Sequence, residues 1–248
     1  MVLTAQELEA LMPDGQQLLS DEPEMESSLH YMQLLLLVTC LEWWWRGRED
    51  FFIGANLTIY FSRQQLRNRD FRGPDFFLVK GIQKQPRNAW VVWEENGKYP
   101  DVIIELLSNS TADTDRGIKK NLYQDQFRTP EYFWFSPETL EFAGFRLVGT
   151  QYQPIAANNI GWLWSETLKL YLGISQGQLR YFTASGERIP TPGEAAQQEQ
   201  QRAQQEQQRA QQEQQRAQQA ELLLEQERQK VEKLAARLRA MGIDPEQV

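Results

Sequence analysis

The chain has 248 residues and a mass of 29.1 kDa, enough for one domain of up to about 200 residues with an appendage, or for two small domains. Its 26 Lys and Arg against 34 Asp and Glu give a net charge of -8, so any attraction to nucleic acid or to an anionic membrane has to be local. The single cysteine, Cys40, and the single histidine, His30, exclude an internal disulfide and any multi-cysteine or multi-histidine metal site.

Sequence patterns exclude several further classes of protein. Residues 1–13 lack the basic start and apolar run of a secretory signal, and the longest apolar stretch, residues 34–41, is far below the roughly 20 residues that cross a bilayer. The patterns GxxxxGK[ST], GxGxxG and GxSxG are absent from the sequence. We therefore expect a cytoplasmic protein with no membrane partner. Carboxylates, lysines and a metal ion are the groups that remain for catalysis.

In chain order, residues 1–190 predict a helix, then strands, a second helix and further strands. Residues 28–45 are rich in long apolar side chains and predict a mostly buried helix capped by Ser27 or Ser28. Short segments rich in β-branched and aromatic residues are the expected strands, at 51–61, 75–80, 89–94, 101–107, 132–135 and 140–148. This order predicts an α/β domain with a mixed sheet.

The second predicted helix covers residues 112–127, between the fourth and fifth expected strands. On it, Ile118 and Leu122 lie on one face, and Asp115, Lys119 and Tyr123 lie on another.

Composition changes abruptly near Pro190. Two prolines and a glycine lie within residues 189–193, and no aromatic residue occurs from 196 to 248. We therefore expect one domain over residues 1–190 and a separate tail over residues 195–248.

The tail carries a seven-residue repeat. The heptad QQEQQRA occurs three times from residue 197 to residue 217. One apolar residue continues this spacing along the tail, at Ala203, Ala210, Ala217, Leu224, Val231 and Leu238. Ala220, Leu234 and Met241 lie three positions after members of that series, and Glu227 is an acidic residue at another position of this kind. The pattern predicts a coiled-coil helix that joins two copies of the chain. The alternative is a solvated or disordered glutamine-rich spacer.

Two acids interrupt segments whose apolar character predicts burial. Glu105 lies within the run VIIELL over residues 102–107, and Asp75 opens the run FFLV over residues 76–79. Because an unpaired buried carboxylate is costly, each acid needs a cation, a set of donors or a metal, or else a proton. A salt bridge from Glu105 to Lys119 or Lys120, with Asp75 as a turn cap, is one interpretation. A catalytic site is the other.

Pro74-Asp75, Glu105 and a following lysine, carried by strand, strand and helix, resemble the PD-(D/E)XK nuclease superfamily. The stretches PDVIIELLS over 100–108, DRGIKK over 115–120 and PEYFW over 130–134 look more closely like the Uma-type restriction endonuclease family. The resemblance covers roughly residues 20 to 190 and leaves the heptads outside.

The chain departs from the superfamily pattern at Leu107, where a lysine is usual two residues after the glutamate. The family's D-x-x-x-K-x-x-x-Y arrangement points to Lys119 as the migrated lysine, with Lys120 as the weaker candidate. Asp101 would share a strand face with Glu105, but the family pattern favours Asp75.

The resemblance implies a restriction-endonuclease-like fold and a metal-dependent DNA endonuclease. Its catalytic residues would be Asp75, Glu105 and Lys119, and Mg²⁺ or Mn²⁺ would be bound by Asp75, Glu105 and the Leu106 carbonyl. The ion would polarise the scissile phosphate, and Lys119 would orient the attacking water. Glu26 would be a further metal ligand, or only an acid placed at a helix start by the macrodipole. The alternative function is a catalytically inactive, nuclease-derived module that binds DNA or acts as a scaffold and oligomerises through its coil.

Residues 63–87 form a locally basic segment beside Asp75, with seven basic residues against two acidic ones. The residues predicted to contact DNA phosphates are Arg63, Arg67, Arg69, Arg72 and, from the second helix, Lys120. An ordinary polar loop is the alternative. His30 is expected to be a packing residue.

Overall fold

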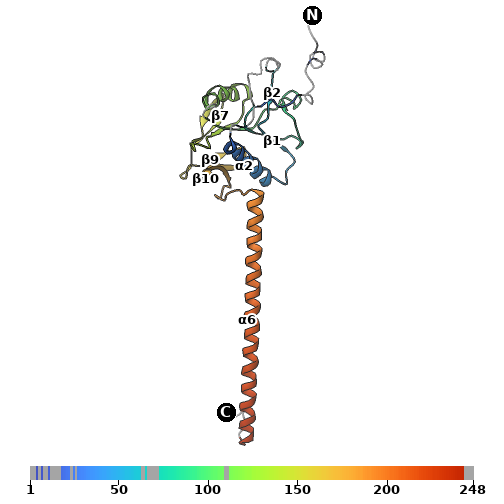
Figure 1. Ribbon diagram of the computed structural model, residues 1–248, viewed down its shortest axis with the longest axis vertical. Coiled ribbons are helices and arrows are strands. Elements are labelled where there is room, and N and C mark those ends of the chain that lie inside the picture. Colours follow the sequence, from blue (N-terminus) through green and yellow to red (C-terminus); the bar gives the residue numbers. More distant parts are fainter. Residues whose placement is uncertain are drawn as a thin grey trace. The chain divides into compact units, whose positions relative to one another are not determined.

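The computed structural model describes residues 4, 7, 11, 18–22, 25, 27–62, 65, 73–108 and 112–242 (Figure 1). It divides into two compact units, Met1–Pro192 and Gly193–Val248. Among the described residues, no helix is both long enough and apolar enough to span a membrane.

The first unit is built on a six-stranded mixed sheet. Its strands, in spatial order, are β1 (Phe51–Ala55), β3 (Phe76–Lys80), β5 (Val102–Leu106), β6 (Glu131–Phe135), β7 (Phe142–Val148) and β8 (Gln151–Pro154). β5 and β6 run parallel, and the other neighbours run antiparallel. The predicted mixed sheet flanked by helices is thereby confirmed.

Two smaller sheets accompany the central one. β9 (Leu163–Ser165), β10 (Leu170–Ser175) and β11 (Gln178–Phe182) form an antiparallel sheet, and β2 (Ile59–Tyr60) pairs parallel with β4 (Trp90–Val91). The strands predicted at 51–61 and 89–94 are longer than the observed ones, because the chain leaves the extended conformation after β1 and after β4. The strands after residue 150 were not predicted.

The first predicted helix is α2 (Ser28–Trp44), and Ser27 caps it by accepting a hydrogen bond from the His30 N–H. Only one side of α2 is buried, at residues such as Leu37, Cys40 and Leu41, whereas Met32 on the other side is 54% exposed. The expectation of a mostly buried helix was therefore wrong for its outer face.

The second predicted helix is not regular. It alternates between α-helical and π-helical turns, in the order α4 (Ala112–Thr114), η2 (Asp115–Lys119), α5 (Lys120–Leu122) and η3 (Tyr123–Phe127). We refer to these four pieces together as the site helix.

The central sheet separates two hydrophobic cores, because side chains alternate along each strand. Ile104 and its strand neighbours two residues away pack into a core with α2 and with the sheet of β9 to β11. Ile103 and Leu107 pack into the other core, which contains Tyr123 and Phe127 of the site helix. Glu105 therefore points into the core beneath the site helix.

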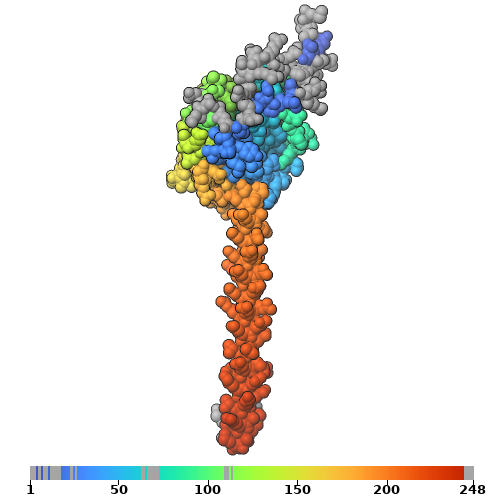
Figure 2. Space-filling model, in the orientation of Figure 1, coloured from blue at the N-terminus to red at the C-terminus, as the bar shows by residue number. Residues whose placement is uncertain are grey.

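Nearly all of the described part of the second unit belongs to one helix, α6 (Pro192–Ala240), whose side chains project on both sides (Figure 2). None of its described residues is buried. Gly242, with φ of +79°, follows the end of the helix, as is common for a glycine at this position. The long C-terminal helix is confirmed, and its pairing with a second copy stays a prediction.

Candidate active site

Asp75 and Glu105 lie opposite each other on one face of the central sheet. β3 and β5 are antiparallel, with Phe76 opposite Ile104 and Phe77 opposite Ile103. Continuing this register by one residue brings Asp75 opposite Glu105. Because side chains alternate along a strand, both acids point to the side of the sheet that packs against the site helix.

Backbone groups fix the two acids to each other's strands. The Leu106 N–H donates to Asp75 Oδ2 at 2.7 Å, and the Asp75 N–H donates to Glu105 Oε2 at 3.3 Å. Glu105 is fully buried, while Asp75 keeps part of its surface exposed. The pair thus lies at the boundary between the core and the surface.

The site helix presents a straight row of side chains at every fourth position. Asp115, Tyr123 and Phe127 are buried, and the Lys119 side chain between them is only 15% exposed. In a regular α-helix, positions four apart drift by about 40° around the axis, so such a row would soon wind away from the sheet. The wider π-helical turns rotate less per residue than α-helical turns. Their alternation with α-helical turns keeps the row on the buried side.

Lys119 and Tyr123 hold the same oxygen of Glu105. Lys119 Nζ lies 3.1 Å from Glu105 Oε1, and the Tyr123 hydroxyl donates to that oxygen at 2.7 Å. The Tyr123 ring is fixed between the rings of Phe127 and Tyr132, with centroids 5.4 and 5.5 Å away. The other oxygen, Oε2, is left on the side of Asp75.

Lys119 also contacts a third acid on its own helix. Its Nζ lies 3.0 Å from Oδ1 of Asp115, which is 1% exposed. The Asp115 carbonyl in turn accepts a hydrogen bond from the Tyr132 hydroxyl at 2.8 Å. One ammonium group therefore lies between two buried carboxylates.

Burial dominates the protonation of the two facing acids. It raises the pKa of the Asp75 carboxyl to about 6 and that of Glu105 to about 7, although the Lys119 charge opposes both shifts. Burial alone would lower the pKa of Lys119, but Glu105, Asp115 and Asp75 outweigh it and raise this pKa above its ordinary value. Burial, and then the Glu105 charge, raise the pKa of Tyr123 well above 10, so its hydroxyl remains a donor at neutral pH.

One oxygen of each facing acid is available to a metal ion. Among the described residues, Glu105 Oε2 accepts the long bond from the Asp75 N–H, and Asp75 accepts the Leu106 N–H through Oδ2 and not through Oδ1; the two carboxyl groups also contact each other. Magnesium is commonly held by one or two carboxylates with water molecules, so these donors fit such an ion. Over the described ranges, no group of three His, Cys, Asp or Glu side chains gathers in a metal-binding arrangement. An all-protein metal cage is therefore not formed by these residues.

The other predicted site residues lie elsewhere or outside the described residues. Lys120 places its Nζ 3.4 Å from the centre of the Phe145 ring. Lys119, not Lys120, is thus the lysine beside the acids. The undescribed positions are Glu26, Arg63, Arg67, Arg69 and Arg72.

His30 is a packing residue, as expected. It is 3% exposed, its Nε2 lies 3.0 Å from the Leu107 carbonyl oxygen, and its Nδ1 lies 2.8 Å from Ser27 Oγ. Because a carbonyl oxygen only accepts, Nε2 carries the proton. His30 thereby ties the start of α2 to the end of β5, two residues from Glu105.

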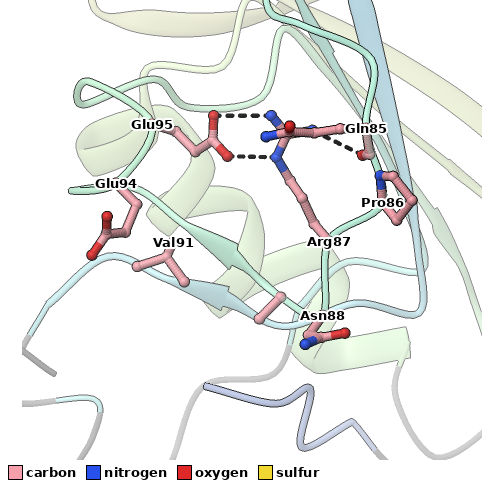
Figure 3. A pocket seen from close by; sticks show the side chains of 8 residues that line it. Gln85, Pro86, Arg87, Asn88, Val91, Glu94 and Glu95 are labelled. Carbon is pink, nitrogen blue, oxygen red and sulfur yellow. Dashed lines mark hydrogen bonds and ion pairs between the residues drawn. The ribbon is translucent and has the colours of Figure 1, made fainter. Parts of the chain in front are cut away.

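The described members of the basic segment are engaged inside the protein. Lys84 pairs with Glu42, and Lys80 donates to the Thr167 carbonyl at 3.1 Å. Arg87 pairs with Glu95 at a polar pocket of about 580 Å³ lined by residues 85–89, 91, 94 and 95 (Figure 3). Since Glu95 matches its charge, Arg87 offers no net positive charge for a phosphate there.

The roles of Asp115 and Tyr123 went beyond what the sequence suggested. Both belong to the D-x-x-x-K-x-x-x-Y spacing, but their contacts with Lys119 and Glu105 were not predicted. The available signal was the four-residue spacing itself. The sequence did not indicate that this row faces the core, because the apolar neighbour Ile118 would be expected to be buried. In the structure Ile118 faces solvent and is 74% exposed.

Comparison with known proteins finds a matching family model and matching solved structures. One solved structure that matches is described as "a putative nuclease belonging to DUF820" from Anabaena variabilis ATCC 29413. It is 15% identical, with a TM-score of 0.42, and the match covers 67% of this chain and 91% of that one. No curated protein matches. A family model described as "Uma2: Putative restriction endonuclease" matches residues 14–182. Because this match spans well over half of the chain, the chain belongs to the Uma2 family.

Proposed function

We propose that this chain is a metal-dependent endonuclease that hydrolyses phosphodiester bonds in DNA. Membership of the Uma2 family supports a nuclease-like function. The observation that carries the finer proposal is the meeting of two carboxylates from separate strands with one ammonium group from the site helix. Such a set can bind a divalent cation and offset charge on a phosphate.

Each residue of the set has a distinct task in this proposal. Asp75 and Glu105 hold Mg²⁺ or Mn²⁺ through their available oxygens, together with the Leu106 carbonyl. When bound, the ion polarises the scissile phosphate and lowers the pKa of a water molecule. Lys119, held at Glu105 Oε1, offsets the negative charge that develops on the phosphate. An ion held through the other oxygen, Oε2, would leave Lys119 in place at Oε1.

Further parts of the proposal rest on the sequence pattern alone. We propose Glu26 as an additional metal ligand and the basic residues of the sequence pattern as contacts to DNA phosphates, at Arg63, Arg67, Arg69, Arg72 and Lys120. We also propose that the tail joins two copies of the chain, so that both strands of a duplex can be cut together.

The second candidate is an inactive nuclease-derived module that binds DNA or acts as a scaffold. The observation in its favour is that Lys119 is already satisfied by Glu105 and Asp115, as a purely structural ion pair would be. The two candidates differ in one measurable respect, since only the first predicts strand cleavage that depends on the acids.

A plasmid assay separates the candidates. Supercoiled plasmid is incubated with Mg²⁺ or Mn²⁺ and with wild type, Asp75→Asn, Glu105→Gln or Lys119→Met. Asp101→Asn is the matched control, because Asp101 precedes β5 and its carboxylate accepts the Lys80 N–H. We expect nicking by wild type and Asp101→Asn only. Equal nicking by all five proteins would assign the activity to a contaminant. DNA binding without nicking by any of them would favour the scaffold.

A further inference from the structure

The inner positions of the tail change character along α6. They comprise the heptad series from Ala203 to Leu238 and the positions three residues after each member, which we call the inner row. In the first half of this row, glutamates occupy the second inner position, three residues after each member of the series, at Glu206 and Glu213. From Ala217 onward the row is apolar except at Glu227.

We propose that two copies of the chain pair in parallel over residues 217–241 of α6, and that the two helices stay apart over residues 203–213. The two tails would then form a coiled coil over residues 217–241 and remain two separate helices over residues 203–213.

Exposed apolar side chains supply the drive for pairing in the second half. Leu224, Val231, Leu234 and Met241 are 59% to 66% exposed on the single helix, although all four lie on the inner row. Burying such a row against the same row of another copy removes this surface from water. More than three heptads of inner-row spacing are available over this range, which is the length that sustains a coiled coil. A β-branched residue at the first inner position, Val231, followed by Leu234 at the second, favours two strands.

Like charges oppose pairing in the first half. In a parallel pair, Glu206 and Glu213 would each face the same residue of the other copy across the seam, and the alanines beside them bury little surface in return. Glu227 is different, because Leu224 and Val231 flank it in the row, where Glu206 and Glu213 have only alanines.

Charge also selects the parallel arrangement. Over this range the positions just before the heptad series carry three basic residues and one leucine, namely Arg216, Leu223, Lys230 and Arg237. In an antiparallel pair aligned over residues 217–241, Lys230 would lie against Lys230 of the partner subunit, whereas a parallel pair places Arg216 beside Glu221 of the partner subunit. The same tail segments then lie side by side in the two copies.

Cysteine cross-linking in the full chain tests both the extent and the direction of pairing. Leu238→Cys and Ala210→Cys introduce a thiol at the same heptad position in the two halves. The native Cys40 is 1% exposed, so wild type is the control for background cross-linking. Under mild oxidation we expect Leu238→Cys to form a disulfide-linked dimer at least about tenfold faster than Ala210→Cys. Equal rates would overturn the confinement of pairing, and no cross-link at residue 238 would overturn the parallel pair.

A gain of pairing tests the role of the glutamates. Adding Glu206→Leu and Glu213→Leu to Ala210→Cys removes the like charges and extends the apolar row, so cross-linking should accelerate to near the rate of Leu238→Cys. The matched control adds Gln208→Leu and Gln215→Leu, which lie on the outer side of the heptad and should leave the rate unchanged. Equal acceleration by both pairs, or by neither, would overturn the assignment of Glu206 and Glu213 as the residues that keep the helices apart.

Discussion

Replacing Lys119 by methionine removes the cation that lies between two buried carboxylates. Lys119 Nζ lies 3.1 Å from Glu105 and 3.0 Å from Asp115, and these acids are 0% and 1% exposed. Removing one partner of a buried ion pair typically costs about 3–5 kcal/mol, because the remaining charge is uncompensated. Methionine preserves most of the aliphatic stem, so packing changes little. We expect the free energy of unfolding of the metal-free protein to fall by about 3–5 kcal/mol at about pH 8.

The loss of stability caused by Lys119→Met should be smaller at about pH 6 than at about pH 8. The pKa of Glu105 is about 7 in the folded protein against an ordinary value of 4.5, so the folded state takes up a proton before the unfolded state as the pH falls. The stability linked to this proton is therefore present at low pH and is lost as the pH rises through about 7. Without Lys119 this pKa rises further. Protonation then relieves part of the uncompensated charge at about pH 6.

Urea unfolding in the presence of EDTA, followed by tryptophan fluorescence at both pH values, measures this effect. Lys120→Met is the matched control on the same helix, since the Lys120 ammonium group lies over the Phe145 ring and not beside the acids. The control should lose less than about 1 kcal/mol. A similarly small loss for Lys119→Met at about pH 8, or an equal loss at both pH values, would refute the electrostatic account of the site.

Three further predictions concern the same site and the tail. Tyr123→Phe removes the hydroxyl that orients Glu105 and should weaken Mn²⁺ binding by at least about tenfold in a calorimetric titration. Tyr152→Phe is the control, because it deletes a hydroxyl bonded to a backbone carbonyl, and it should leave Mn²⁺ binding unchanged. Equal weakening of Mn²⁺ binding by the two substitutions would contradict the role of the Tyr123 hydroxyl in orienting Glu105. Because the ion needs both acids deprotonated, Mn²⁺ affinity should rise about twentyfold from about pH 6 to about pH 8, and a flat profile would argue against Asp75 and Glu105 as ligands. Ending the chain after Gly193 should lower the oligomer mass in light scattering while the first unit stays folded, and an unchanged mass would exclude the tail from assembly.

Local pattern predicted the elements that have strong local signals. The apolar run after Ser27 gave the helix α2, and the β-branched and aromatic runs gave β3, β5 and β6 close to their observed bounds. The heptads predicted the long helix α6 in the same way. The strands β8 to β11 were not anticipated. They are three to six residues long, and their pairing partners are supplied by the folded domain.

The sequence by itself also determined where to look for chemistry. Glu105 and Asp75 stand out because a charged residue in an apolar strand requires a partner, whatever the fold. Composition alone excluded an internal disulfide and any multi-cysteine or multi-histidine metal site, since the chain has one residue of each type.

Only the tertiary structure decided which residues meet. The antiparallel register of β3 and β5 brings Asp75 opposite Glu105, and a shift of one residue would send them to opposite faces of the sheet. Because α-helical and π-helical turns alternate, Lys119 points toward Glu105, and Lys120 lies over the Phe145 ring. Strand register and helix phase arise from the packing of whole elements against each other. The sequence pattern can therefore identify charged residues within apolar segments, but the packing of the sheet against the helix determines which of these residues come into contact.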